Sequence, residues 1–121
     1  MPKKILIIDD DRDVHEILEL RLAMFGYEMF HAMNGNEGCL KATEIKPDLI
    51  FLDISMPGID GVETLKKLKT EMPDDVKKIP VVMLTTHEHL QSNCLKMGAA
   101  AYMTKPFDLY ALKEVLARLL P

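Results

Sequence analysis

Short apolar segments alternate with segments of helical periodicity along this chain, and that alternation limits the fold more than any other feature. Five segments are apolar or rich in β-branched residues and are bounded by turn-forming or charged residues. The predicted strands are residues 4–9, 27–32, 48–53, 80–85 and 101–104. Strands separated by helices form a parallel sheet that is covered on both faces. The sequence therefore predicts an α/β fold.

Five helices are expected, one after each strand, and several of them begin at a recognisable cap. Asp11, Asp60 and Asp108 each precede a predicted helix, and a side-chain oxygen at that position accepts a hydrogen bond from a free backbone N–H. The segment from Met72 to Lys78 contains Pro73 and mixed charges, so we expect a surface loop there. The predicted helices span residues 12–25, 36–45, 61–71, 87–97 and 109–119.

The order of the strands follows from general rules for such sheets and from analogy. At 121 residues the chain has the length of one domain, and we expect residues 1–121 to form it. Crossovers between parallel strands are right-handed, which leaves few arrangements. By analogy with flavodoxin-like, doubly wound sheets we expect the order 2-1-3-4-5. In that order the first and third strands are neighbours, and ligands bind where their carboxyl ends meet.

Composition and charge argue against several classes of protein. The net charge of -4 argues against a general nucleic-acid surface, so we expect no direct binding of nucleic acid by this domain. No apolar run approaches the roughly 20 residues of a membrane helix, and the N-terminus does not have the form of a signal peptide. Cys39 and Cys94 lie in predicted helices without metal-ligand spacing and are expected to be buried. We therefore expect a cytoplasmic protein with no membrane partner.

Carboxylates follow two strands that the expected order places side by side. Asp9, Asp10 and Asp11 follow the first strand, and Asp53 ends the third. Asp11 is the expected cap of the next helix, whereas capping does not explain Asp9 and Asp10. Carboxylates crowded into one pocket repel one another unless a cation or protons neutralise them. The pattern indicates a divalent metal ion and chemistry on a phosphoryl group.

Two further side chains follow strands at the same predicted edge of the sheet. Thr85 ends the fourth strand; threonine is a common strand residue, but a hydroxyl at this place can donate to a phosphoryl oxygen. Lys105 follows the fifth strand. Most surface lysines are simply solvated, but Pro106 restricts the backbone of Lys105 and can direct its ammonium group into an acidic pocket. Both residues are therefore candidates for the site.

Four segments together resemble the receiver domain of two-component response regulators, a family that includes the bacterial chemotaxis response regulator. The segments are ILIIDDD at 5–11, LDISMPGIDG at 52–61, VVMLT at 81–85 and YMTKPF at 102–107. Each is moderately specific by itself, but all four occur in the family's order and spacing, and the resemblance extends from residue 3 to residue 120. It implies a flavodoxin-like fold and a signalling switch that phosphorylation operates, without conventional enzyme activity.

The resemblance assigns the chemistry to particular residues. It implies that Asp53 accepts a phosphoryl group from a histidine of a sensor histidine kinase or a histidine phosphotransfer protein. It also implies that Mg²⁺ is held by the carboxylates of Asp9, Asp10 and Asp53 and by the backbone carbonyl of Ser55. These hard oxygen donors are the ligands that Mg²⁺ takes in proteins. Ser55 and His87 occupy positions where the family tunes the lifetime of its phosphate, although His87 can equally be a solvated residue at a helix start.

The resemblance also implies how the signal leaves the site. Thr85 and Lys105 hold the phosphoryl oxygens, and Tyr102 turns inward as Thr85 moves toward the phosphate. The surface formed by helix 87–97, strand 101–104 and the last helix then changes and controls a downstream target or an output domain. A phosphorylation-dependent homodimer through that surface is an open alternative. Its exposed groups are expected to include Lys96, Tyr102, Lys113 and Arg118.

Two other functions compete with the switch. A phosphatase of the haloacid-dehalogenase type also has an aspartate nucleophile after its first strand, which here would be Asp9. The chain is short for that fold, and Asp53 would have no nucleophilic role in it. A flavin or nucleotide binder would use the same type of sheet, but neither G-x-G-x-x-G nor a P-loop is present.

The other histidines and one threonine are interpreted without a role in the chemistry. His15, His31 and His89 show no ligand pairing in the sequence and are expected to be ordinary surface or half-buried residues. Thr86 stands where the resembled family more often has a smaller residue, so its bulk is expected to narrow access to the pocket.

Overall fold

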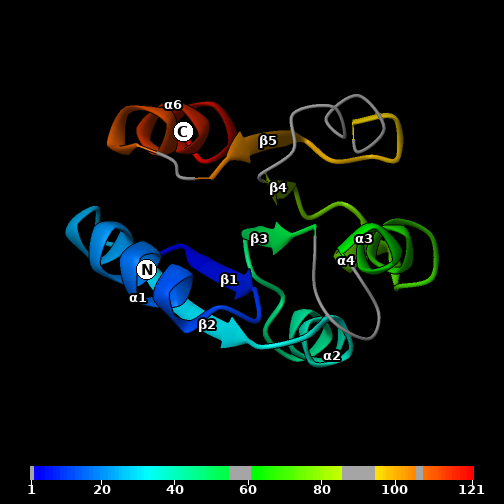
Figure 1. Cartoon of the computed structure of the whole chain (residues 1–121). Coiled ribbons are helices and arrows are strands. Elements are labelled where there is room, and N and C mark those ends of the chain that lie inside the picture. Colours follow the sequence, from blue (N-terminus) through cyan, green and yellow to red (C-terminus); the bar gives the residue numbers. More distant parts are fainter. Residues whose placement is uncertain (1, 55–60, 86–94, 106–107) are drawn as a thin grey trace.

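The sheet has the expected topology. The structure, a computed structural model, describes residues 2–54, 61–85, 95–105 and 108–121. Within these residues five strands form one sheet in the order β2-β1-β3-β4-β5, and every neighbouring pair is parallel (Figure 1). The flavodoxin-like prediction is therefore confirmed. The strands are β1 Lys4–Ile8, β2 Glu28–Ala32, β3 Leu49–Asp53, β4 Val81–Thr85 and β5 Ala101–Thr104.

Helices cover both faces of the sheet. In Figure 1, α1 and α6 lie against one face, and α2, α3 and α4 lie against the other. The predicted helix 87–97 falls for the most part outside the described residues. None of the helices in the described ranges is long and apolar enough to cross a bilayer. The helices are α1 Arg12–Met24, α2 Gly35–Ile45, α3 Gly61–Thr70, α4 Asp74–Lys77 and α6 Leu109–Leu119.

Side-chain caps fix the starts of three helices. The carboxylate of Asp11 accepts a hydrogen bond from the backbone N–H of Asp13, and Asp108 accepts one from Ala111. Both caps were expected from the sequence. Asn34 caps α2 in the same way. Asp60, the expected cap of α3, lies outside the described residues.

The segment predicted as a loop after α3 contains a helical turn. The prediction of a continuous surface loop over 72–78 was wrong, because Asp74–Lys77 forms α4. Pro73, with φ of -57°, is already in the conformation that precedes a helix, and Asp74 and Asp75 place negative charge at its first turn. Val76 is 1% exposed and belongs to the core, so burial of one side chain holds the turn against the sheet.

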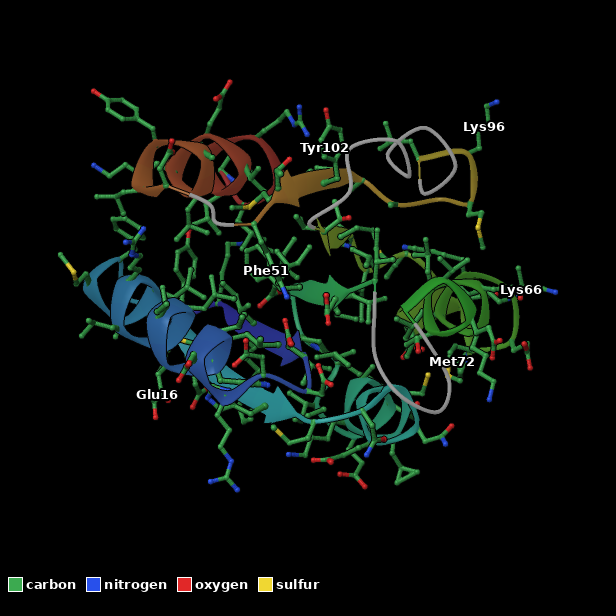
Figure 2. The ribbon with its side chains drawn as sticks, viewed as in Figure 1. Glu16, Phe51, Lys66, Met72, Lys96 and Tyr102 are labelled. Carbon is green, nitrogen blue, oxygen red and sulfur yellow. The ribbon has the colours of Figure 1, made fainter. Side chains whose placement is uncertain are left out.

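Two apolar clusters fill the space between the sheet and its helices. Successive strand residues point to opposite faces, so Ile7 packs beneath α1 and α6 whereas Ile8 packs beneath α2 and α3. Phe51 is fully buried between the sheet and its helical cover (Figure 2). Cys39 is buried as expected, and Cys94 lies outside the described residues. Strands that are apolar on both faces are typical of parallel sheets.

The register of the strands determines where the acidic residues meet. Ile8 pairs with Leu52, and Asp53 pairs with Leu84 on the other side of β3. Asp9 follows Ile8 directly, so Asp9 and Asp53 lie beside each other on adjacent strands. Because all five strands are parallel, this is the carboxyl edge of the sheet, where open α/β folds bind their ligands.

Candidate functional site

Three carboxylates converge at the carboxyl edge of the sheet. Asp9 is fully buried, Asp53 is 5% exposed, and Asp10 is exposed to solvent. One carboxylate oxygen from each of the three lies within 4.8 Å of the others. This donor set consists only of hard oxygens and fits a cation such as Mg²⁺, which keeps several waters beside one or two carboxylates. The structure thus brings together the three predicted carboxylate ligands.

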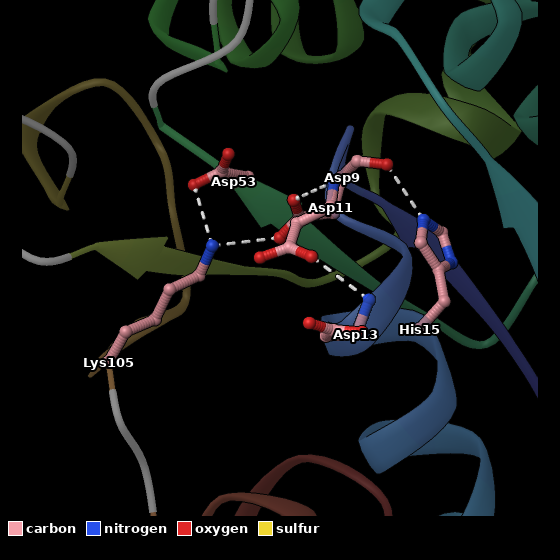
Figure 3. Close-up of polar contacts among 6 residues, drawn as sticks. All are labelled: Asp9, Asp11, Asp13, His15, Asp53 and Lys105. Carbon is pink, nitrogen blue, oxygen red and sulfur yellow. Dashed lines mark hydrogen bonds and ion pairs between the residues drawn. The ribbon is translucent and has the colours of Figure 1, made fainter.

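Lys105 supplies the positive charge that these carboxylates require. Its Nζ lies 2.9 Å from Oδ2 of Asp9 and 3.1 Å from Oδ1 of Asp53 (Figure 3). The backbone N–H of Lys105 donates to the carbonyl of Thr85 at 2.7 Å, which anchors the residue to the end of β4. Burial by itself lowers the pKa of Lys105, but the hydrogen bonds and charges of Asp9 and Asp53 outweigh it and raise that pKa above its ordinary value. Lys105 is therefore an ammonium ion that bridges two buried carboxylates.

The carboxylate of Asp9 has a fixed orientation. Its Oδ1 accepts a hydrogen bond from the backbone N–H of Asp11 at 2.9 Å, while its Oδ2 faces Lys105. Its backbone N–H donates to the carbonyl of Ala32 at 3.1 Å, and its own carbonyl accepts from Nε2 of His15 at 2.7 Å. These contacts hold the residue from several sides before any ligand arrives. A preorganised carboxylate of this kind is what a metal site needs.

Thr85 and Tyr102 lie on the same face of the sheet. Tyr102 pairs with Met83, and Thr85 lies two residues after Met83, so the three side chains point to the same side. Thr85 is buried at the end of β4, next to the carboxylate edge, and Tyr102 is half-buried on β5. A movement of the Thr85 side chain would therefore change the space on the face of the sheet where the Tyr102 ring packs. The arrangement is compatible with the coupled movement expected from the sequence.

A cavity of about 610 Å³ lies between β5 and α6. Tyr102 and Arg118, two of the residues expected on the output surface, line it. Lys96 is exposed nearby and extends away from the molecule in Figure 2. Lys113 is exposed too, but its Nζ lies 5.8 Å from the centre of the Phe25 ring at the end of α1. That contact places Lys113 toward α1 rather than with the other three.

Gly61 is a site residue that the sequence did not single out. Its backbone N–H donates to the carbonyl of Ile54 at 2.8 Å, and a Cβ atom at this position would lie 2.0 Å from the backbone oxygen of Asp53. The first turn of α3 thus packs directly on the backbone of the candidate phosphoacceptor. The sequence signal was present, since a glycine at the first position of a helix that follows a site strand is typical of close backbone approach.

His15 and His31 form a pair, and His15 is buried, contrary to the expectation of a surface or half-buried residue. His15 is 7% exposed, and its Nδ1 lies 2.7 Å from Nδ1 of His31. His31 is half-buried as expected, but its Nε2 also lies 3.2 Å from Oε1 of Glu19. The helical spacing of His15 from Leu18 was a signal of burial, whereas the pairing depends on how α1 docks on β2. His89 lies outside the described residues.

Three further residues were expected at or beside the site. Ser55, Thr86 and His87 fall in segments 55–60 and 86–94, outside the described residues. The roles expected of these residues are the carbonyl ligand of Ser55, the bulk of Thr86, and the tuning of the phosphate lifetime by Ser55 and His87. These roles therefore remain predictions from the sequence.

The sheet is flavodoxin-like, and it carries three carboxylates and one bridging lysine where the carboxyl ends of its strands meet. This combination defines a class of small domain that is suited to metal-assisted phosphoryl chemistry. Residues 5–117 match the family model of the response regulator receiver domain, and the chain belongs to that family. As a receiver domain it is a phosphorylation-activated signalling module. None of the similarities supports the alternative of a phosphatase that uses Asp9.

Individual relatives agree with the family assignment. The chain is 38% identical over 120 residues to the DNA-binding dual master transcriptional regulator RpaA of Synechocystis, covering 98% of this chain and 47% of RpaA. Among solved structures it is similar to the chemotaxis protein CheY4 of Vibrio cholerae, with a TM-score of 0.89, 30% identity and coverage of 99% and 100%. The response regulator TrrA of Thermotoga maritima, solved in complex with Mg²⁺-BeF, gives a TM-score of 0.86 at 35% identity, with coverage of 98% and 99%. The chain spans about half the length of the curated relatives it matches.

Proposed function

We propose that Asp53 accepts a phosphoryl group from a histidine of a sensor histidine kinase or a histidine phosphotransfer protein. The observation that carries this proposal is the position of Lys105 Nζ, 3.1 Å from Asp53 and 2.9 Å from Asp9. A buried carboxylate beside a fixed cation can act as a nucleophile toward phosphorus, because charge on the transferring oxygens is neutralised as it develops.

Mg²⁺ is the cation that suits the three carboxylates. Asp9, Asp10 and Asp53 offer hard oxygen donors within 4.8 Å of one another, and the backbone carbonyl of Ser55 is the proposed further ligand. When bound, Mg²⁺ supplies positive charge to the oxygens of the transferring group and helps to orient it. TrrA, a relative solved with Mg²⁺-BeF, supports this choice of metal.

The transfer itself forms one bond and breaks one. A carboxylate oxygen of Asp53 attacks phosphorus in line, while the bond between phosphorus and the donor's imidazole nitrogen breaks. The imidazole leaves with the electron pair of that bond. Lys105 stays beside Asp53 and holds one phosphoryl oxygen, and the hydroxyl of Thr85 donates to another. Asp53 then carries an acyl phosphate with additional negative charge and acceptor oxygens.

The modification biases two packings of the β4–β5 region. Thr85 moves toward the phosphoryl group, and Tyr102 fills the space on the same face of the sheet. The surface of segment 87–97, β5 and α6 changes and controls a downstream target or an output domain. A phosphorylation-dependent homodimer through this surface is part of the proposal, and unchanged mass in light scattering on activation would remove it. We place these events in the cytoplasm.

The phosphate lifetime is proposed to depend on residues beside the acceptor. Ser55 lies two residues after Asp53 and His87 two residues after Thr85. We expect His87 to influence how water reaches the acyl phosphate, so that His87→Ala changes the rate of dephosphorylation more than that of phosphorylation. Equal phosphate lifetimes in wild type and variant would contradict this role.

The test is phosphorylation by a small donor. The protein is incubated with acetyl phosphate with and without Mg²⁺, and its intact mass is measured. A single phosphoryl adduct is expected only with Mg²⁺, and it should disappear in Asp53→Asn. Asp74→Asn serves as the matched control, because Asp74 is an exposed carboxylate on α4 outside the acidic cluster.

Two results would overturn the assignment. An adduct that survives in Asp53→Asn but is lost in Asp9→Asn would move the nucleophile to Asp9. No adduct in wild type with either acetyl phosphate or a phosphorylated histidine phosphotransfer protein would mean that the pocket no longer accepts phosphate.

A further inference from the structure

A chain of hydrogen bonds connects the acidic pocket to the outer surface of the molecule on the side of α1 and β2. It begins at the backbone carbonyl of Asp9, which lies 2.7 Å from Nε2 of His15. Nδ1 of His15 lies 2.7 Å from Nδ1 of His31, and Nε2 of His31 lies 3.2 Å from Glu19. Figure 3 shows the first link, with His15 reaching from α1 to Asp9.

The acceptors at the two ends define where the protons lie. A carbonyl oxygen only accepts, so Nε2 of His15 carries a hydrogen and donates it to Asp9. Nδ1 of a neutral His15 is then an acceptor, and Nδ1 of His31 must donate to it. The second nitrogen of His31 faces a carboxylate, which also only accepts. His31 therefore joins His15 to Glu19 in one chain of contacts.

We infer that His15 is a positioning residue for the Mg²⁺ site, and that His31 and Glu19 hold it in the required tautomer. Asp9 and Asp10 lie at the turn between β1 and α1, so the direction of this turn determines where their carboxylates point. The His15 N–H fixes the carbonyl of Asp9 on the side of the turn opposite to Lys105, as the dashed contacts in Figure 3 indicate.

The pattern matches how metal sites are supported in general. Groups outside the metal's own ligands orient those ligands through hydrogen bonds, and their loss weakens metal binding by about tenfold or more. Here the support comes from a histidine that is 7% exposed and that belongs to a different element from the ligand it holds. This inference rests on the proposed Mg²⁺ site and adds to it the residues that tune its affinity.

Two variants of His15 separate the hydrogen bond from the packing. Glutamine can place an amide N–H near the position of Nε2, whereas methionine is similar in size and offers no donor. We expect His15→Met to raise the dissociation constant for Mg²⁺ by about tenfold. We expect His15→Gln to restore most of the affinity. His31→Ala, which leaves the first link in place, should weaken Mg²⁺ binding less than His15→Met.

Mg²⁺ affinity is measured directly, by titrating the unphosphorylated protein with Mg²⁺ and following backbone amide signals of residues 9–13 by NMR. The rate of phosphorylation by acetyl phosphate is then measured against Mg²⁺ concentration. A positioning role predicts that the half-saturating Mg²⁺ concentration rises while the rate at saturating Mg²⁺ changes little. The control is Leu22→Ala, which removes a fully buried side chain further along the same helix.

The outcomes separate this inference from the proposed function. Equal Mg²⁺ affinity in wild type and His15→Met would overturn it, as would an equal loss of affinity in Leu22→Ala at a similar loss of thermal stability. Failure of His15→Gln to differ from His15→Met would show that packing, not the N–H, matters. If wild type binds Mg²⁺ in the NMR titration but is not phosphorylated, the proposed function fails while the role of His15 can still be measured.

Discussion

Two half-buried lysines lie at opposite ends of the parallel strands, and their pKa values are shifted in opposite directions. Lys69 lies at the amino edge, where its Nζ donates to the carbonyls of Lys77 at 3.0 Å and Ile79 at 2.6 Å. Lys105 lies at the carboxyl edge between two carboxylates. Burial lowers the pKa of Lys69, whereas at Lys105 the partners outweigh burial and the pKa is raised.

The difference shows that the charge of the partner, and not burial, decides what a lysine does. Lys69 joins α3 to the last residue of α4 and to the segment before β4 through neutral acceptors, which is a structural contact. Lys105 neutralises a cluster that would otherwise repel itself, and it stays charged where we propose that phosphoryl oxygens bind. Variants of residues at both ends of the strands test this contrast.

The largest effect is expected from removing the ammonium group at the carboxyl edge. Lys105→Met leaves Asp9 and Asp53 as buried carboxylates without their cation, so in the absence of Mg²⁺ the free energy of unfolding should fall by about 3 kcal/mol. Added Mg²⁺ should restore much of the loss, and phosphorylation by acetyl phosphate should remain at least about tenfold slower. Urea unfolding with and without Mg²⁺ measures the first effect.

The control for this variant is Lys96→Met, at an exposed lysine. It should change neither unfolding nor phosphorylation. If the unfolding free energy of Lys105→Met without Mg²⁺ equals that of wild type, the carboxylates of Asp9 and Asp53 do not repel each other appreciably. The proposed difference between Lys105 and Lys69 would then be wrong.

The two regions should also differ in the effect of adding a Cβ atom at a glycine. A Cβ atom added at Gly61 would lie 2.0 Å from the backbone oxygen of Asp53, and neither backbone can move without shifting the proposed phosphoacceptor. Gly61→Ala should therefore cost about 2–3 kcal/mol of unfolding free energy and slow phosphorylation. A Cβ atom added at Gly98 would lie 3.2 Å from the flexible side chain of Lys69, but the φ of Gly98 is +107°. Gly98→Ala should cost about 1–2 kcal/mol through backbone strain and leave phosphorylation intact.

Thermal unfolding and the mass-based phosphorylation assay separate the two glycine variants. A Gly61→Ala protein that is destabilised but phosphorylated at the wild-type rate would show that the position of the Asp53 backbone is not critical. Equal slowing of phosphorylation in both variants would point to a general effect of lower stability.

The sheet and the acidic cluster could be predicted because they depend on local patterns. The apolar runs that end at Ile8 and Leu52, and the caps at Asp11 and Asp108, are visible in short stretches of sequence and recur in the structure. Once parallel order is assumed, the ends of the strands must meet at one edge. Lys105 was predictable for the same reason, because it directly follows a strand.

What could not be predicted depends on docking between elements. The contact of Gly61 with Asp53 and the pairing of His15 with His31 are set by how α3 and α1 pack on the sheet. The turn of α4 was missed because its stability comes mainly from burial of Val76, which no local pattern of four residues reveals. Lys69 looked like any helix-surface lysine, since its acceptors are backbone carbonyls without a sequence signature.

A moderate effect is expected from removing the ammonium group at the amino edge. Lys69→Met fills similar space but leaves the carbonyls of Lys77 and Ile79 without this donor, which should cost about 1–2 kcal/mol. Mg²⁺ should not restore the loss, in contrast to Lys105→Met. Lys66→Met on the same helix is the control, because Lys66 extends into solvent in Figure 2 and its loss should stay within about 0.5 kcal/mol. Recovery of Lys69→Met by Mg²⁺ would contradict the distinction between the edges.

The smallest effect concerns pH and tests directly whether the pKa of Lys69 is lowered in the folded protein. Its pKa in the folded protein lies below the ordinary value of 10.5, so between these two values the unfolded chain binds more protons than the folded one. Stability contributed by this group therefore rises as pH increases through that window. The neutral amine can still donate to both carbonyls, so the contact survives deprotonation. The difference in unfolding free energy between wild type and Lys69→Met should widen from neutral to alkaline pH in urea titrations. A difference that narrows instead would mean that the two carbonyls stabilise the ammonium form more than burial disfavours it, and Lys69 would then resemble Lys105.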